Sequence, residues 1–213
     1  MDRAHVLDAL GAVYDPELDE PITALEFVSS CEVSADGDVD VRLRLPTPQC
    51  APNFAYLMAA DARDAVRRLP EVRAVSVVLE DHYTGDEING AVGRGGTFAD
   101  AFPGETESGL DALRELFQRK ALLARQSRLM SVPATTLGEL TGPDADRCRV
   151  LRRALGIDAS DDAPAFVTGD GTPVAASDVR FRRMASLTAL SLETNGGICR
   201  DLLKTRYGGK VAA

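Results

Sequence analysis

The chain has 213 residues, 45% of them hydrophobic, which is enough to form one large domain or two small ones. Its formal net charge of −9 is unevenly spread: residues 1–96 carry 8 Lys and Arg against 18 Asp and Glu, whereas residues 97–213 carry 16 against 15. The acidity disfavours a nucleic-acid partner, because phosphate binding needs a basic face. The uneven charge suggests two units of different character.

No apolar run approaches the length of a membrane span, and the N-terminus MDRAHVLDALG lacks the features of a signal peptide. We therefore expect a cytoplasmic protein that does not associate with membranes. The four cysteines form no CxxC pair, so neither a disulfide framework nor a four-ligand zinc site is expected in a reducing compartment.

The first part of the chain predicts a helix followed by a β-hairpin. Apolar residues at helical spacing predict a helix over 3–13, which ends before Asp15-Pro16 because a residue before proline avoids the α region. A strand over 22–33 and an alternating strand over 39–45 flank Asp36-Gly37-Asp38, a strong turn sequence.

A second helix and a third strand complete the first unit. The stretch 52–69 has an apolar stripe, begins at Pro52 and is stopped by Pro70; the Val-rich stretch 72–79 predicts a strand. The order helix, strand, strand, helix, strand describes a small two-layer α+β domain over residues 1–83.

The rest of the chain predicts a linker and a mostly helical domain. Residues 84–106 are rich in glycine and are expected to be a linker. Residues 107–213 form the helical domain, with helices at 107–130, 143–155 and 177–194, a hairpin at 166–174, and a break at Asn195-Gly196-Gly197 before a short basic helix. We expect this domain to bind a partner protein.

The sequence LRLPTPQCAPNF (43–54) places Cys50 between a strand and the start of a helix. Free N–H groups and the positive end of the helix dipole favour thiolate over thiol at that position, and a thiolate binds iron or attacks an electrophile. The alternative is that Cys50 is a small, buried apolar residue, which is the commoner fate of a free cysteine.

Three blocks together resemble the SufT/PaaD-like iron–sulfur cluster assembly domain: VYDPELDEPITALEFV (13–28), LRLPTPQCAP (43–52) and LPEVRAVSVVL (69–79). The resemblance covers about residues 3–82. It implies an α-β-β-α-β fold, a role in the maturation of metalloproteins, and a surface site where Asp15, Thr47 and Cys50 converge. It also implies a transiently bound iron–sulfur cluster or iron.

The chain departs from the family pattern in two places. Glu26 stands where the family usually has glycine, and Ala51 stands where a proline usually follows the cysteine. Glu26, Glu17 of the Asp-Pro-Glu motif and Thr47 are therefore expected to shape the site. Asp15 either hydrogen-bonds or ligates metal beside the thiol, or it acts as a turn residue; Thr47 is explained equally well by a hydrogen bond within its own turn.

The other candidate ligands are weaker. Cys199 follows the expected helix break, so the argument for an activated thiol at a helix start applies to it as well. Asp81 and His82 at a strand end could offer oxygen and imidazole ligands to iron, although such a pair is usually solvated surface. Cys31 and Cys148 lie on apolar stripes and are expected in the core.

Three kinds of function are open. The first is a non-enzymatic factor that carries iron or a cluster on Cys50, or docks an assembly scaffold, and helps mature a metalloenzyme client. Its single thiol site is compatible with a cluster shared across a homodimer. The second is a metal-independent folding accessory or adaptor for a metalloenzyme such as an oxygenase component. The third, a thiol-dependent enzyme, is disfavoured because no His or second Cys lies near Cys50 in the sequence.

Overall fold

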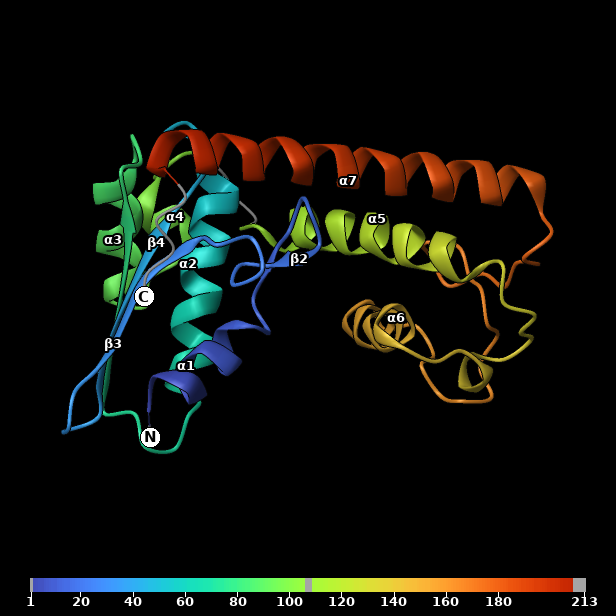
Figure 1. The fold of residues 1–213 in the computed structure, drawn as a ribbon, viewed down its shortest axis with the longest axis horizontal. Coiled ribbons are helices and arrows are strands. Elements are labelled where there is room, and N and C mark those ends of the chain that lie inside the picture. The colour runs from blue at the N-terminus through green and yellow to red at the C-terminus, as the bar shows by residue number, and fades with distance from the viewer. Residues whose placement is uncertain (1, 106–108, 209–213) are drawn as a thin grey trace. The chain divides into compact units, whose positions relative to one another are not determined.

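A computed structural model describes residues 2–105 and 109–208 of the chain. The described residues fall into two compact units. The first comprises residues 1–111 and 196–213, and the second comprises residues 112–195. The mixed α+β class expected from the sequence is confirmed, with small sheets in the N-terminal part followed by helices (Figure 1).

The first unit is built on a three-stranded sheet. Its strands are β3 (Val28–Val33), β4 (Asp38–Arg44) and β5 (Ala74–Glu80), with β3 and β4 antiparallel and β4 and β5 parallel. The predicted turn closes the β3–β4 hairpin, where Gly37 has φ of +85° and an added Cβ would lie 2.5 Å from the carbonyl oxygen of Glu71. Glycine is therefore required there by both conformation and space.

Two helices cover one face of this sheet (Figure 1). They are α1 (Arg3–Leu10), capped by Asp2, and α2 (Pro52–Arg67), which forms the crossover between β4 and β5. The alternation of β4 is as predicted: Val39, Val41 and Leu43 point into the core, and the residues between them point outward. A two-residue ladder between β1 (Tyr14–Asp15) and β2 (Glu20–Pro21) follows α1.

The stretch expected to be a linker is largely helical, so that expectation is wrong. It contains α3 (Gly85–Gly93) and α4 (Phe98–Ala101), and Ile88, Ala91 and Val92 are buried in the core of the first unit. Tertiary burial of these apolar residues outweighs the low helix propensity of the glycines. Residue 106 of the expected linker, and residues 107 and 108 of the expected helix, lie outside the described residues.

The second unit has its own core. Its bounds of 112–195 are narrower than the helical domain expected over 107–213, because residues 196–213 belong to the first unit. It contains most of α5 (Asp111–Leu129), the short helix η1 (Leu137–Glu139), α6 (Pro143–Ala154) and the first part of α7 (Val179–Tyr207). The hairpin expected over 166–174 is reduced to an isolated bridge between Val167 and Pro173. No helix in the described part of the chain is long and apolar enough to span a bilayer.

The expected break at Asn195-Gly196-Gly197 is absent, because α7 runs without interruption from Val179 to Tyr207. Each glycine costs a helix about 1 kcal/mol relative to alanine, so packing must offset roughly 2 kcal/mol. In the first unit, Leu203 is buried, and Cys199 and Tyr207 pack against the core. Burial of these side chains accounts for the continuity of the helix.

Candidate functional site

The segment between β4 and α2 holds Cys50 in a defined turn. Cys50 precedes Ala51, the N-cap of α2, and its N–H lies 3.4 Å from the carbonyl oxygen of Thr47. The Thr47 hydroxyl oxygen lies 3.6 Å from Cys50 Sγ and also accepts a hydrogen bond from the Gln49 N–H. The thiol is half-buried, so it is neither fully enclosed in the core nor fully exposed on the surface.

The backbone of this turn is fixed from the strand-end segment that follows β5. The N–H of Tyr83 donates to the carbonyl oxygen of Pro48 at 3.0 Å, and His82 Nε2 lies 2.8 Å from the carbonyl oxygen of Cys50. His82 Nδ1 accepts from the Thr84 N–H, so the proton resides on Nε2, which donates to Cys50. Burial lowers the pKa of His82, and Arg206 lowers it further.

His82 therefore has a positioning role in this structure. Both of its ring nitrogens are engaged by the backbone and by Thr84, and neither is directed at the Cys50 thiol in the contacts described. Asp81, its neighbour, has φ of +54°, and its carbonyl and carboxylate oxygens accept hydrogen bonds from Arg206 and Tyr207. The expectation that Asp81 and His82 bind iron stays a prediction.

Asp15 is the last residue of β1, directly before the turn to β2, and is 8% exposed. Its Oδ1 accepts hydrogen bonds from the N–H groups of Glu17 (2.8 Å) and Leu18 (2.9 Å), as a turn-forming aspartate does. Burial raises the pKa of Asp15 to about 6, against the lowering effect of these hydrogen bonds, and Glu17 and Glu20 raise it further. The carboxyl group therefore changes charge near neutral pH.

Cys199 lies well inside α7, so the expectation that it occupies the first turn of a helix is wrong. Burial raises the pKa of the Cys199 thiol to about 11. Electrostatic interactions with Asp15, Cys50 and Glu17 raise it further, while Arg200 opposes the shift. Cys199 is therefore a protonated thiol at neutral pH. These influences on its pKa place Cys199 in one neighbourhood of the first unit with Cys50 and Asp15.

Polar contacts hold the last turns of α7 against the first unit. Arg200 pairs with Glu20 at 2.6 Å. Arg44 stacks over the ring of Tyr207, 5.1 Å from its centroid. The backbone of Gly196 approaches Glu20 so closely that an added Cβ would lie 2.8 Å from the carboxylate. The sequence pattern gave no signal for this arrangement, because Glu20 and Arg200 are 180 residues apart.

Among the described residues, no three His, Cys, Asp or Glu side chains are grouped so as to hold a metal ion. Cys31 and Cys148 are buried in the cores of the first and second units. Glu26 is exposed and has φ of +61°, a left-handed conformation that favours glycine, which explains why the family pattern has glycine there.

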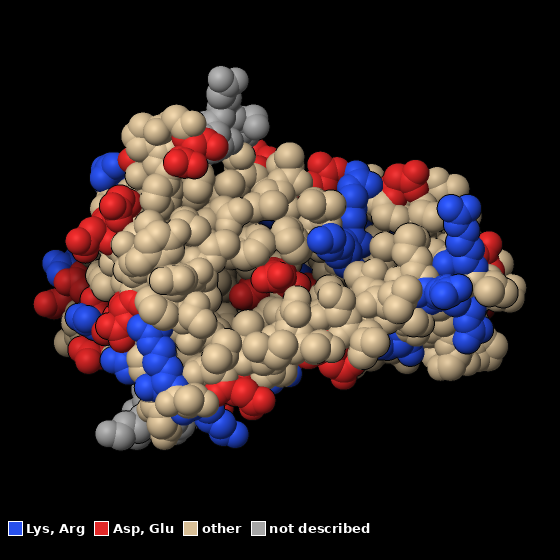
Figure 2. Space-filling model, turned by 90° about the horizontal axis from the view of Figure 1, so that it is seen from above, with Lys and Arg blue, Asp and Glu red and all other residues tan. Residues whose placement is uncertain are grey.

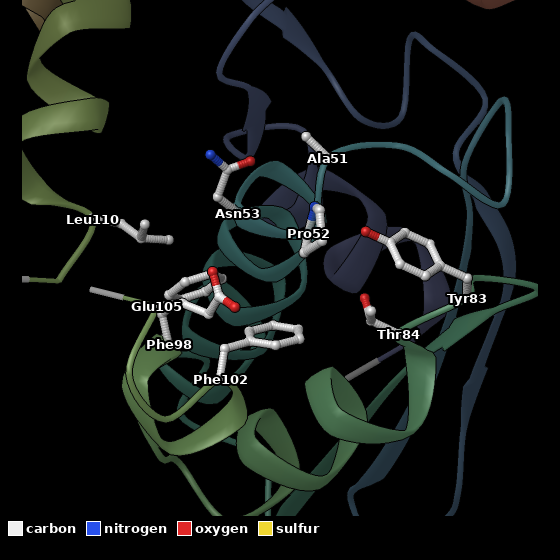
Figure 3. A pocket seen from close by; sticks show the side chains of 9 residues that line it. All are labelled: Ala51, Pro52, Asn53, Tyr83, Thr84, Phe98, Phe102, Glu105 and Leu110. Atoms are coloured by element: carbon white, nitrogen blue, oxygen red, sulfur yellow. The ribbon is translucent and has the colours of Figure 1, made fainter.

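A pocket that the sequence did not reveal opens beside this turn. Its volume is ≈ 590 Å³, and it lies at the start of α2 and against the segment after β5 (Figure 3). Its lining comprises Ala51, Pro52, Asn53, Tyr83, Thr84, Phe98, Phe102, Glu105 and Leu110. The residues come from four separate segments, so only folding brings them together.

The comparisons with known proteins concern the N-terminal part of the chain. The sequence profile of a family described as iron–sulfur cluster assembly protein matches residues 3–77. The uncharacterized protein MJ1129 of Methanocaldococcus jannaschii is 34% identical over 87 residues, which cover 41% of this chain and 90% of the relative. Through its N-terminal part the chain therefore belongs to the family of iron–sulfur cluster assembly proteins, and this family supports a general role in iron–sulfur cluster assembly.

Proposed function

We propose that the protein is a non-enzymatic maturation factor of the SufT/PaaD-like type, which handles iron or an iron–sulfur cluster as transient cargo on Cys50 and helps deliver it to a metalloenzyme client. One observation carries the proposal. The half-buried Cys50 thiol is held in a fixed turn beside Thr47, and Cys199 and Asp15 lie in the same neighbourhood.

The donors of this neighbourhood suit cargo that passes through. Clusters that stay in a protein are commonly held by four thiolates. Here two thiols and one buried carboxyl group share a neighbourhood, but the described residues form no group of three that could hold a metal ion. The missing ligands would then come from a scaffold, a client or a second copy of the chain. Cys199 would have to lose its proton before it could ligate, which makes the second thiol a conditional ligand.

The second unit supports the client-binding half of the proposal. Met184, Leu187 and Leu190 are exposed on the part of α7 that belongs to this unit, and they are 46%, 59% and 59% exposed. Figure 2 looks onto α7 and shows a broad uncharged surface there. Exposed apolar groups gathered on one helix are typical of protein-binding surfaces.

An enzymatic thiol is less well supported. A Cys–His pair needs an imidazole within hydrogen-bond reach of the sulfur. His82 instead donates to the carbonyl oxygen of Cys50 and accepts from Thr84. The metal-independent adaptor remains the second candidate, supported by the exposed apolar side chains of α7, which would act without either thiol.

Anaerobic reconstitution with iron and sulfide tests the proposal. We expect the full chain to develop visible absorption of a cluster, Cys50→Ala to lose it, and Cys199→Ala to retain it in part. Cys148→Ala is the matched control, because it removes a thiol from the core of the second unit. If the wild type develops no absorption, or if Cys50→Ala matches it, the carrier function is wrong.

Client maturation in cells separates the two candidates. A carrier with Cys50→Ala should fail to mature its metalloenzyme client while the variant still folds. An adaptor with the same change should co-purify with the client and mature it fully. That second result would move the function to the apolar face of α7.

A further inference from the structure

The pocket beside the turn that holds Cys50 is lined by an unusual number of aromatic residues for this protein. Aromatic residues make up only 5% of the chain, yet Tyr83, Phe98 and Phe102 all line this one cavity. Tyr83 is 60% exposed, so its ring contributes little to the core. Figure 3 shows the three rings arranged around Pro52, with the carboxylate of Glu105 beside the two phenylalanines.

The aromatic walls are held in place by packing and capping. The ring of Phe98 packs edge-on against Tyr56 at 5.5 Å and lies 4.9 Å from the ring of Phe102. The Tyr56 hydroxyl donates to the carbonyl oxygen of Gly96, and a reciprocal capping interaction between Thr97 and Asp100 fixes the start of α4. The pocket is therefore largely formed before any ligand binds.

The charge of the pocket favours a cation. Among the described residues that line it, Glu105 alone is an acidic or basic residue. The unit around it carries 12 Lys and Arg against 23 Asp and Glu, counted over residues 1–111 and 196–213. Such a surplus attracts a basic segment at long range, and the faces of aromatic rings attract cations at contact.

The start of α2 offers little to a competing anion. Pro52 has no N–H, the Phe54 N–H is engaged by the Asn53 side chain, and the Ala55 N–H bonds to the carbonyl oxygen of Ala51. Pro52 and Phe54 therefore account for two of the four positions that usually leave free donors at a helix start, which weakens an anion site there. The full negative charge of Glu105 then outweighs the partial positive charge of the helix dipole.

We propose that this pocket binds an arginine side chain from a basic segment of the client protein. A planar guanidinium can stack on an aromatic face and also form a two-point hydrogen bond with a carboxylate, which an ammonium cannot do. The walls of the pocket continue into the thiol turn, because Ala51 and Pro52 directly follow Cys50 and Tyr83 bonds to Pro48. A bound arginine therefore anchors the client next to the thiol; this part rests on the proposed function.

Titration of the full chain with the peptide acetyl-Gly-Arg-Gly-amide, followed by amide NMR spectra, tests the proposal. We expect shifts at Tyr83, Thr84 and Phe102. We expect at least fivefold weaker binding of the citrulline peptide, which has the same shape without the charge. The lysine peptide should also bind more weakly, and inorganic phosphate should not bind there.

Two variants sharpen the test. Glu105→Gln should weaken binding of the arginine peptide about fivefold or more, whereas Glu32→Gln, an equal loss of charge on the exposed side of β3, should change it less than twofold. Equal binding of arginine and citrulline peptides, shifts that map elsewhere, or no effect of Glu105→Gln would overturn the proposal. Cluster loading of the wild type and of Glu105→Gln is measured alongside. A wild type that loads a cluster but does not bind the arginine peptide refutes the pocket and leaves the carrier function standing.

Discussion

Cys50 and Cys199 are both half-buried thiols of the first unit, but their surroundings differ. Cys50 lies in a turn before a helix, beside the Thr47 hydroxyl and with its backbone fixed by His82. Cys199 lies inside a continuous helix, where burial and neighbouring acids raise the pKa of the thiol to about 11. The comparison teaches that two half-buried thiols of one unit can differ in their surroundings: burial and neighbouring acids raise the pKa of Cys199 inside a helix, whereas Cys50 lies in a turn at a helix start.

The substitution with the largest expected effect removes packing that holds the segment around Cys199 in place. Leu203→Ala should lower the free energy of unfolding of the first unit by about 2–4 kcal/mol, because it removes a buried side chain that packs the end of α7 on the core. Urea unfolding followed by circular dichroism measures this. Leu202→Ala, at an exposed position one residue away, is the control and should cost less than about 0.5 kcal/mol. Equal losses would show that the last turns of α7 are not held by burial.

The next largest effect is the dependence of stability on pH that Asp15 causes. The folded state raises the pKa of Asp15 from 3.8 to about 6, so it holds the proton more tightly than the unfolded chain. The stability due to this group is therefore full below about pH 4 and is lost as the pH rises through 6. At pH 8 the loss amounts to roughly 3 kcal/mol or less.

Asp15→Asn keeps an oxygen that can accept from the N–H groups of Glu17 and Leu18 but cannot ionise. We expect the variant to match the wild type near pH 4 and to be more stable by roughly 2–3 kcal/mol at pH 8. Denaturant unfolding at several pH values checks the prediction. A parallel offset at all pH values would mean that the Asp15 charge is not the cause.

Alkylation rates compare the two thiols directly. A pKa of about 11 lowers the thiolate fraction of Cys199 about 100-fold relative to an ordinary thiol, and the greater nucleophilicity of a basic thiolate restores about tenfold of that. Cys199 should therefore react with iodoacetamide about tenfold more slowly than a free thiol at pH 8. Its rate should rise about tenfold per pH unit up to about pH 10. Mass spectrometry of the peptides follows both cysteines, and we expect Cys50 to react faster than Cys199. A Cys199 rate that levels off near pH 9 would point to restricted access instead.

The smallest expected effect tests whether Glu26 shapes the thiol neighbourhood. Glu26→Gly relieves a left-handed conformation, and the gain is reduced by the greater freedom of glycine in the unfolded chain, so we expect stabilisation of about 0.5–1 kcal/mol. Because the side chain is exposed, alkylation of both thiols should stay unchanged. Thermal unfolding and the alkylation assay together check this, and a changed Cys50 rate would give Glu26 a role at the site.

Local sequence signals determined much of the first unit. Alternating residues in 39–45 gave a half-buried strand, Asp36-Gly37-Asp38 gave the hairpin turn, and Pro52 and Pro70 bracketed the second helix. The turn that carries Cys50 could also be predicted from the sequence, because prolines and a helix start fix the backbone geometry over a few residues. These features depend on neighbours in the chain, which a single sequence displays.

Tertiary structure alone decided the rest. Glycines indicated a linker at 84–106 and a break at 195–197, but burial of Ile88, Val92 and Leu203 outweighs the cost of glycine in a helix. The raised pKa of Cys199 and the pocket around Glu105 arise from residues that lie far apart in the sequence and meet only in the fold. Burial and long-range charge act through space, so no local pattern records them.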